Sequence, residues 1–233
     1  MNALEIRDLT KHYTGFSLNH LNLTLPWGCI MGLVGENGAG KSTTIKLILN
    51  TIPRDGGTVT ILGRDNRENL CLSKEEIGVV LDEVGISACL TARQVGKIMQ
   101  GIYRSWDEAV FSDYLTRLAV PADKKFKDFS RGMKMKLGIA VALSHDSKLL
   151  ILDEATSSVD TRTEQRIQTA MDRLMEGRTS FVIAHRLSTI RDADLILVMR
   201  DGDIVEQGTH DQLIEAGGFY ADLYNSQFED VVD

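Results

Sequence analysis

The glycine-rich stretch "GENGAGKST", Gly35 to Thr43, limits the possible folds of this chain more than any other feature. It follows the apolar run "CIMGLV" (29–34), which predicts a short buried strand, and it precedes "STTIKLILN", whose apolar positions fit a helix. Its spacing matches G-x-x-x-x-G-K-S/T, the pattern of a phosphate-binding loop between a strand and a helix. A chance glycine turn would not bring both flanking elements, so we predict such a loop in an α/β fold.

The chemistry of this loop follows from its residue types. Glycines let backbone N–H groups curl around a β-phosphate, Lys41 reaches the β and γ oxygens, and the Ser42 hydroxyl can bind Mg²⁺. The N-terminus of the following helix adds partial positive charge at the same place. We therefore predict that the chain binds a nucleoside triphosphate. The candidate nucleotide-binding residues of this loop are Gly35, Asn37, Gly38, Ala39, Gly40, Lys41, Ser42 and Thr43.

The segment "SKLLILDEATSSVD" (147–160) places four apolar residues directly before two carboxylates, Asp153 and Glu154. A carboxylate at the end of a buried strand beside a phosphate loop can hold Mg²⁺ through water, which is the role predicted for Asp153. Because strand side chains alternate between faces, Glu154 points elsewhere and can aim at the water that attacks the γ-phosphate. A solvated acidic turn is the alternative, but it would not explain the apolar run.

Length and composition fit one globular domain and argue against several other classes of protein. With 233 residues the chain can bury a sizeable core, and one large domain with an inserted subdomain is favoured over two independent domains. The net charge of −7 argues against a broad nucleic-acid surface. Three cysteines without C-x-x-C spacing favour a reducing compartment over a disulfide framework or a zinc site. Because no apolar run approaches the roughly 18 residues that span a bilayer, we expect any membrane role to come through a partner.

Strands alternate with helices along the chain. The stretches "ALEIRDLTKHY" and "FSLNHLNLTL" alternate apolar and polar residues, which predicts an antiparallel pair of half-exposed strands. The stretch from Thr91 to Ala119 predicts a helical insert, and another helix is expected from Ser130 to about His145. Further predicted elements are strands at "GGTVTILG", "IGVVL", 149–152, "TSFVIA" and "DLILVM", a helix over 161–175, a hairpin turn at Asp201-Gly202 and a helical tail from His210. Such alternation implies an α/β fold whose ligand lies at the carboxyl ends of the strands.

With these motifs in place, essentially the whole chain resembles the ATPase subunits of ABC (ATP-binding cassette) transporters. The resemblance implies a P-loop NTPase domain over 1–233 with a mostly parallel core sheet, an N-terminal antiparallel β subdomain and a helical subdomain inserted at 84–145. Tyr13 matches the aromatic residue that stacks on adenine, and His185 matches the switch histidine that contacts the γ-phosphate. Asp160 in "SSVD" matches the loop near the dimer seam. Core packing of Tyr13 and an ordinary polar role for His185 are the alternatives.

The segment "FSRGM" (129–133) stands where the family has its LSGGQ signature. Ser130 and Gly132 lie at the predicted start of a helix, so their hydroxyl and backbone N–H groups form an anion site. In the family this site closes on the ATP held by the other subunit, which implies a head-to-tail homodimer or a pseudo-dimer with a related ATPase. Arg131 and Met133 replace the usual glycine and glutamine, and Arg131 either adds charge or is simply exposed.

A second departure from the family follows "IGVVL", where a glutamine normally touches Mg²⁺ and relays to the permease. This chain has Asp82 and Glu83 there. Asp82 either binds the metal, directly or through water, or is a surface acid in a loop. The metal-binding residues expected are thus Ser42, Asp153 and Asp82, and the catalytic residues expected are Glu154, His185 and Lys41.

The two halves of the chain resemble different branches of the family. Residues 1–154, with "FSRGMKMKLGIAVALSHDSKLLILDE", resemble the separate-chain ATPases of bacterial ABC-2-type exporters. Residues 155–233 resemble the nucleotide-binding domain of multidrug and lipid exporters, which is normally fused behind transmembrane helices. We therefore expect a hybrid, natural or engineered, with a join near 154–156 and a separate ABC-2-type chain as its permease.

The function expected from this resemblance is Mg²⁺-dependent ATP hydrolysis that powers a permease from the cytoplasmic face of the membrane, with no nucleic-acid partner. A degenerate or engineered nucleotide-binding domain with slow, uncoupled hydrolysis is the alternative, although Lys41, Asp153, Glu154 and His185 are all present. A non-transport ABC ATPase would usually show paired cassettes or long coiled-coil or basic inserts, and none is evident. The sequence does not encode the transported substrate.

Overall fold

The computed structural model describes residues 1–68, 75–81, 85–153, 175, 177–184 and 186–229. The chain divides into two compact units. The first unit consists of residues 1–73 and 179–233, and the second unit consists of residues 74–178.

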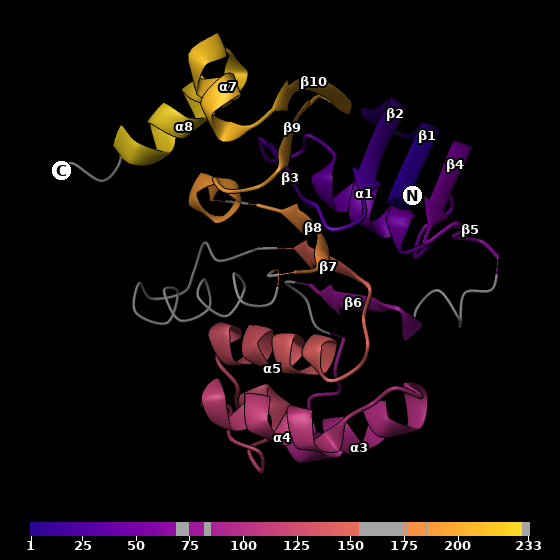
Figure 1. Ribbon diagram of the computed structural model, residues 1–233, viewed down its shortest axis with the longest axis vertical. Helices are drawn as coiled ribbons and strands as arrows, with labels where there is room; N and C mark the ends of the chain where they lie inside the picture. Colours follow the sequence, from indigo (N-terminus) through magenta and orange to yellow (C-terminus); the bar gives the residue numbers. More distant parts are fainter. Residues whose placement is uncertain (69–74, 82–84, 154–174, 176, 185, 230–233) are drawn as a thin grey trace. The chain divides into compact units, whose positions relative to one another are not determined.

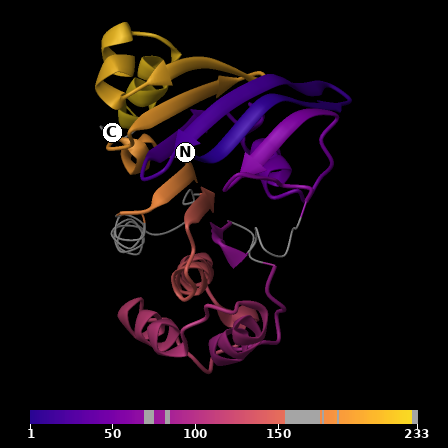
Figure 2. The same cartoon turned by 45° about the vertical axis from the view of Figure 1, so that its right-hand side comes forward.

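The first unit contains an antiparallel sheet with the strand order β2-β1-β4-β5. Figures 1 and 2 show β1, β2 and β4 side by side. The bounds of these strands are β1 Asn2–Tyr13, β2 Phe16–Pro26, β4 Gly56–Ile61 and β5 Arg64–Asp65. The apolar residues that alternate along β1 and β2 are buried, whereas most of the polar residues between them are exposed. The antiparallel pair predicted from that alternation is therefore confirmed.

Parallel strands form the second layer of the first unit. Strand β3 (Ile30–Gly35) pairs in parallel with β8 (Thr179–Ile183) on one side and with β9 (Leu195–Arg200) on the other. Strand β10 (Asp203–Gly208) runs antiparallel to β9. Most residues of β3, β8 and β9 are buried, which explains why these strands form continuous apolar runs in the sequence and not alternations.

The helices of the first unit begin and end at residues suited to those positions. Their bounds are α1 Lys41–Ile48, the 3₁₀ turn η2 Leu187–Ile190, α7 His210–Ala216 and α8 Phe219–Glu229. Thr209 and Gln212 form a capping box at the start of α7, and Gly217 ends that helix in the left-handed region. The start of α8 is capped from a strand, because the Glu206 carboxylate on β10 accepts hydrogen bonds from the N–H groups of Phe219 and Tyr220.

The described residues of the second unit form two parallel strands and three α-helices. Strand β6 (Ile77–Val80) pairs in parallel with β7 (Leu149–Asp153). The helices are α3 Ala92–Ile102, α4 Glu108–Arg117 and α5 Arg131–Leu143, with a 3₁₀ turn η1 at Phe126–Asp128. Side chains of Thr91, Asp107 and Ser130 accept backbone N–H hydrogen bonds at the starts of these three helices. The sequence-predicted helices in 91–119 and from Ser130 are confirmed.

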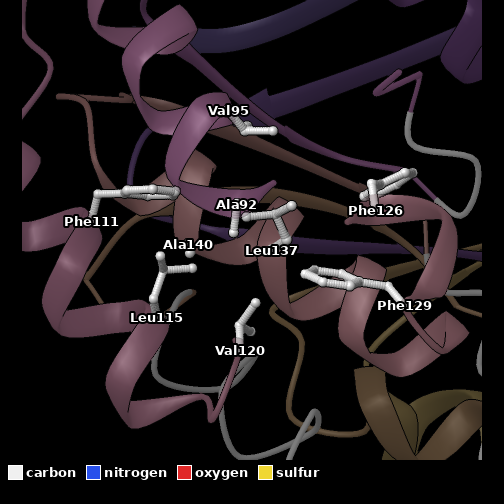
Figure 3. Close-up of a cluster of buried hydrophobic side chains, with 9 residues drawn as sticks. All are labelled: Ala92, Val95, Phe111, Leu115, Val120, Phe126, Phe129, Leu137 and Ala140. Atoms are coloured by element: carbon white, nitrogen blue, oxygen red, sulfur yellow. The ribbon is translucent and has the colours of Figure 1, made fainter. Parts of the chain in front are cut away.

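The helices of the second unit share one apolar core, shown in Figure 3. Side chains from α3, α4, η1 and α5 point toward one another there. The buried members are Ala92, Val95, Phe111, Leu115, Val120, Phe126, Phe129, Leu137 and Ala140.

The subdomain boundaries 84–145 stay a prediction, and the helix expected over 161–175 lies almost entirely outside the described residues. Within the described ranges, none of the helices has the length and apolar character required to cross a bilayer.

Candidate functional site

A pocket of about 590 Å³ opens over the loop between β3 and α1. That volume is in the range of small-molecule sites. Its lining includes seven of the eight loop residues predicted from the sequence to bind nucleotide, and the eighth, Gly35, contributes its carbonyl group nearby. The lining residues are Gly15, Phe16, Glu36, Asn37, Gly38, Ala39, Gly40, Lys41, Ser42, Thr43, Arg200 and Asp201. The predicted loop residues therefore line one and the same pocket.

The Lys41 side chain holds the loop in a closed curve. It is buried, and its Nζ donates hydrogen bonds to the carbonyl oxygens of Gly35 at 2.6 Å and Glu36 at 2.9 Å. These carbonyl groups stand at the other end of the loop, so the ammonium group links the end of β3 to the first turn of α1. A positive charge on a fixed stem beside the pocket is suited to a phosphate oxygen.

The start of α1 faces the same pocket. Gly40 takes the position before the helix with φ of 115°, and the N–H of Thr44 donates to its carbonyl oxygen. Within the described part of the chain, no side chain caps this helix start. The N–H groups of the first turn and the positive end of the helix dipole are therefore directed at the pocket lining around Lys41 and Ser42, an arrangement that favours an anion.

An aromatic pair stands at the turn between β1 and β2. The Tyr13 ring is 47% exposed, and it stacks on Phe16 with ring centroids 6.5 Å apart. The Lys11 Nζ lies 5.5 Å from the centre of the Tyr13 ring. Because Tyr13 is half exposed, it is not a core residue, and the packing alternative considered from the sequence does not hold. Stacking of Tyr13 on adenine stays a prediction.

Sequence reasoning missed Phe16 and Arg200, which both line the pocket. Phe16 could have been found from its position three residues after Tyr13, across a two-residue turn. Arg200 carried no such signal. It reaches the pocket because β9 pairs in parallel with β3, in a register that sets Met199 opposite Gly35. This register brings the end of β9 to the loop from a distant part of the sequence.

Asp153 lies in the second unit, at the end of β7. The four residues before it are fully buried, and Asp153 itself is half-buried. The predicted change from an apolar strand to a carboxylate is thus confirmed in the local structure. Asp153 and the phosphate loop belong to different units. Among the described residues, no group of three or more His, Cys, Asp or Glu side chains could hold a metal ion by itself.

The signature segment forms the start of α5 in the second unit. Ser130 is the residue before the helix, and its hydroxyl accepts a hydrogen bond from the N–H of Met133 at 3.3 Å. Gly132 is buried in the first turn, and Arg131 is half-buried. Both interpretations of Arg131, a contribution of charge or a simply exposed side chain, stay predictions.

Several residues predicted to act in the site fall outside the described residues. They are Asp82, Glu83, Glu154, Asp160 and His185. Their roles remain predictions that rest on the sequence and on the family resemblance.

Comparison with known proteins decides the family. Residues 18–157 match the family model described as ABC transporter, and this match covers more than half of the chain. The chain belongs to the ABC transporter family. Its fold is accordingly that of an ABC-type P-loop NTPase, α/β with an antiparallel β part and a helical part.

Curated members of the ABC transporter family match almost the whole chain. The chain is 38% identical to the uncharacterized ABC transporter ATP-binding protein YfiC of Bacillus subtilis and 38% identical to the ATP-dependent lipid A-core flippase of Escherichia coli. Both matches cover 97% of this chain, and they cover 40% and 41% of the relatives. The chain therefore spans about 40% of the length of these relatives.

Solved ABC transporter structures are similar in fold. One is a bacterial Atm1-family ABC exporter with ATP bound, at 28% identity and a TM-score of 0.83, over 97% of this chain and 42% of that one. Another is an ATP-binding subunit of an ABC transporter, at 23% identity and a TM-score of 0.82, over 97% of this chain and 98% of that one. The second likeness concerns the fold alone.

These matches do not support the hybrid expected from the sequence. The lipid A-core flippase and the Atm1-family exporter each match 97% of the chain, so the similarity is not confined to residues 155–233. A join near 154–156 has no support from the comparisons. The same holds for the separate ABC-2-type permease, which was inferred from that join.

Proposed function

We propose that this chain binds ATP with Mg²⁺ and hydrolyses it, as the nucleotide-binding domain that powers the permease of an ABC transporter. One observation carries the proposal most directly. The loop of the expected sequence pattern curls around a pocket, with the buried Lys41 ammonium and the start of α1 both directed at that pocket. This combination places positive charge and backbone donors where a polyphosphate would bind.

The nucleotide would lie with its phosphates over the first turn of α1 and its base toward the aromatic pair Tyr13 and Phe16. Lys41 would bind the β and γ oxygens, because its ammonium group is held at the pocket by hydrogen bonds to the carbonyl groups of Gly35 and Glu36. Phe16 in the pocket lining, with Tyr13 stacked on it, would offer an aromatic surface to adenine. The distribution of charge and aromatic area in the first unit fits both ends of ATP.

The donor atoms available fit Mg²⁺. The Ser42 side chain is exposed in the pocket lining and offers a hydroxyl oxygen, and Asp153 offers a carboxylate oxygen. Mg²⁺ prefers such oxygen ligands and is usually held by one or two protein groups together with phosphates and water. When bound, the ion would neutralise charge on the β and γ phosphates. Asp82 is the further candidate ligand named from the sequence.

Hydrolysis would depend on residues that follow two strands. Glu154 comes directly after Asp153 and would orient and deprotonate the attacking water, whereas His185 would contact the γ-phosphate. Both roles come from the family resemblance and from the position of the residues beyond β7 and β8.

The active form would be a head-to-tail dimer with ATP between the subunits. Ser130 and Gly132 at the start of α5 would approach the phosphates bound by the partner, and Asp160 would lie near the seam. The hydroxyl and N–H groups at this helix start suit an anion. The permease would be a transmembrane partner or a transmembrane part of the same exporter, and the ATPase would act at the cytoplasmic face of the membrane.

Calorimetric titration with Mg-ATP tests the binding step. Lys41→Ala should weaken binding strongly, because it removes the buried charge beside the phosphates. Lys46→Ala is the matched control, since Lys46 lies on the same helix but is exposed and outside the pocket lining. Equal affinity of the Lys41 and Lys46 variants would contradict the proposal.

A further inference from the structure

The turn between β9 and β10 is held against the phosphate loop. Asp201 and Gly202 form this two-residue turn with φ of 49° and 87°, the left-handed values of a type I′ hairpin. The N–H of Gly202 donates to the carbonyl oxygen of Ala39 at 3.0 Å, and its carbonyl oxygen accepts from the N–H of Asn19 at 3.2 Å. In Figure 2 the hairpin runs alongside the strands of the antiparallel sheet. These hydrogen bonds hold the turn beside the pocket, which Asp201 lines.

Arg200, the last residue of β9, brings a second positive charge to the pocket lining. Among the described residues that line the pocket, Lys41 and Arg200 are the cations, whereas Glu36 and Asp201 are the anions. Without Arg200 the two carboxylates would face a single ammonium group. A triphosphate carries several negative charges, so a second cation in the lining makes the charge balance of the pocket more favourable to it.

The guanidinium group of Arg200 also has a positioned aromatic partner. Its central carbon lies 4.9 Å from the centre of the Phe219 ring, at the first residue of α8. The Arg200 Nε lies 3.7 Å from a carboxylate oxygen of Asp201, which is long for an ion pair, and both of these side chains are more than half exposed. The stacking contact is therefore the more specific constraint on where the guanidinium group lies.

The position of Phe219 is in turn set by the same hairpin. Glu206 on β10 accepts the N–H of Phe219 at 2.6 Å and the N–H of Tyr220 at 2.9 Å. Strand β9 therefore carries Arg200, and its neighbour β10 fixes the ring on which Arg200 stacks. A long side chain held in this way loses less freedom when it binds a ligand.

We infer that Arg200 is a further binding residue for the nucleotide polyphosphate and that Phe219 positions it, so that the C-terminal helix α8 takes part in the nucleotide site. The inference rests on the proposed function, because it assigns a contact to the ATP bound in that pocket. It extends the site beyond the loop and the aromatic pair to the hairpin and to α8.

Mg-ATP titration of single and double variants tests the inference. Arg200→Ala should weaken binding about 10-fold, the scale of one hydrogen bond to a charged group. Phe219→Leu should weaken it about 3-fold, the scale of an exposed cation–π contact. The double variant should bind like Arg200→Ala alone, because Phe219 acts through Arg200. The difference in Mg-ATP affinity between wild type and Arg200→Ala should become smaller at high ionic strength, since salt screens exposed charges.

Two further variants complete the design. Arg200→Lys keeps the charge but not the planar stack, so its affinity should fall between those of wild type and Arg200→Ala. Arg7→Ala, at another exposed arginine of the first unit outside the pocket lining, should bind like wild type. Thermal melts followed by circular dichroism show whether each variant is folded, and Arg200→Lys serves as the test if Arg200→Ala is not.

The outcomes separate the inference from the proposed function. Wild-type protein that fails to bind Mg-ATP would overturn both. If Lys41→Ala loses affinity while folded Arg200→Ala or Arg200→Lys binds like wild type, the inference alone is wrong. Equal losses from Phe219→Leu in the presence and absence of Arg200 would contradict the positioning role of Phe219.

Discussion

The carbonyl oxygen of Met199 occupies the space that a side chain on Gly35 would need. A Cβ atom added to Gly35 would lie 2.1 Å from that oxygen, and the Gly35 φ of 154° is itself unfavourable for other residues. Gly35 ends β3 and opens the phosphate loop, and Met199 belongs to the paired strand β9. The loop can therefore begin there only because position 35 has no side chain.

Gly35→Ala should lower both the stability of the protein and its affinity for Mg-ATP. The backbone of β3 or β9 would have to move, and either shift displaces the loop that holds Lys41. The stability loss should be at least about 1 kcal/mol, because a backbone atom cannot give way as a flexible side chain can. Urea unfolding and calorimetric titration measure the two effects.

The same substitution at Gly101 is the matched control. Gly101 lies in helix α3, where an added Cβ would meet nothing within 4 Å. Gly101→Ala should leave stability unchanged or raise it by about 0.4–1 kcal/mol, since alanine restricts the unfolded chain. Equal behaviour of the two alanine variants would contradict the steric account of Gly35.

Burial of His145 in the second unit predicts a pH dependence of stability. Its ring stacks on Tyr103 with centroids 4.0 Å apart, and its Nδ1 lies 3.2 Å from the carbonyl oxygen of Glu75. Burial lowers the pKa of His145 below its ordinary 6.5, although the bond to Glu75 opposes this shift. As pH falls through 6.5, the unfolded chain binds a proton before the folded one does, so the contribution to stability is complete above 6.5 and is lost below it.

His145→Phe isolates this contribution. Phenylalanine keeps a ring against Tyr103 but cannot titrate, so its unfolding free energy should vary less with pH below 6.5 than that of the wild type. The difference should grow by at most about 1.4 kcal/mol per pH unit, the limit for one proton. Urea unfolding at a series of pH values measures it. If the unfolding free energies of the two proteins vary with pH in parallel, the pKa of His145 is not lowered in the folded protein.

The aromatic pair makes a separate prediction about the base. Tyr13→Ala should weaken Mg-ATP binding by about 1–3 kcal/mol if the ring stacks on adenine, the scale of base stacking on aromatic residues. Because Tyr13 is 47% exposed, thermal stability should change little. Tyr13→Trp should be tolerated. Unchanged affinity of Tyr13→Ala would rule out base stacking, and Phe16→Ala would then test whether Phe16 provides the surface.

The parts of the fold that could be predicted are those with a local signal. About ten neighbouring residues were enough to predict each of three features. These are the pair of strands β1 and β2, from their alternation; the end of β7, from the apolar run before Asp153; and the loop around Lys41, from its glycine pattern. The start of α5 is equally local, because Ser130 can accept the N–H of Met133 three residues later.

The parts that could not be predicted depend on pairing between distant segments. Arg200 lines the pocket because Met199 lies opposite Gly35, and no periodicity in the sequence reveals that register. The cap that Glu206 provides for α8 is hidden in the same way, since the carboxylate lies on a strand thirteen residues before Phe219. The hybrid expectation found no support for another reason: likeness of short phrases to different branches is weaker evidence than relatives that match 97% of the chain.

Phosphate release from ATP tests the central claim of hydrolysis most directly. The wild-type chain should release phosphate from ATP in the presence of Mg²⁺, and chelation of the metal should stop it. Glu154→Gln should bind Mg-ATP like the wild type, because the side chain keeps its size, but it should lose nearly all turnover together with its carboxylate. Mg²⁺-dependent turnover that survives in Glu154→Gln would contradict the assigned base, and absence of turnover in the folded, ATP-binding wild-type chain would contradict the claim of hydrolysis itself.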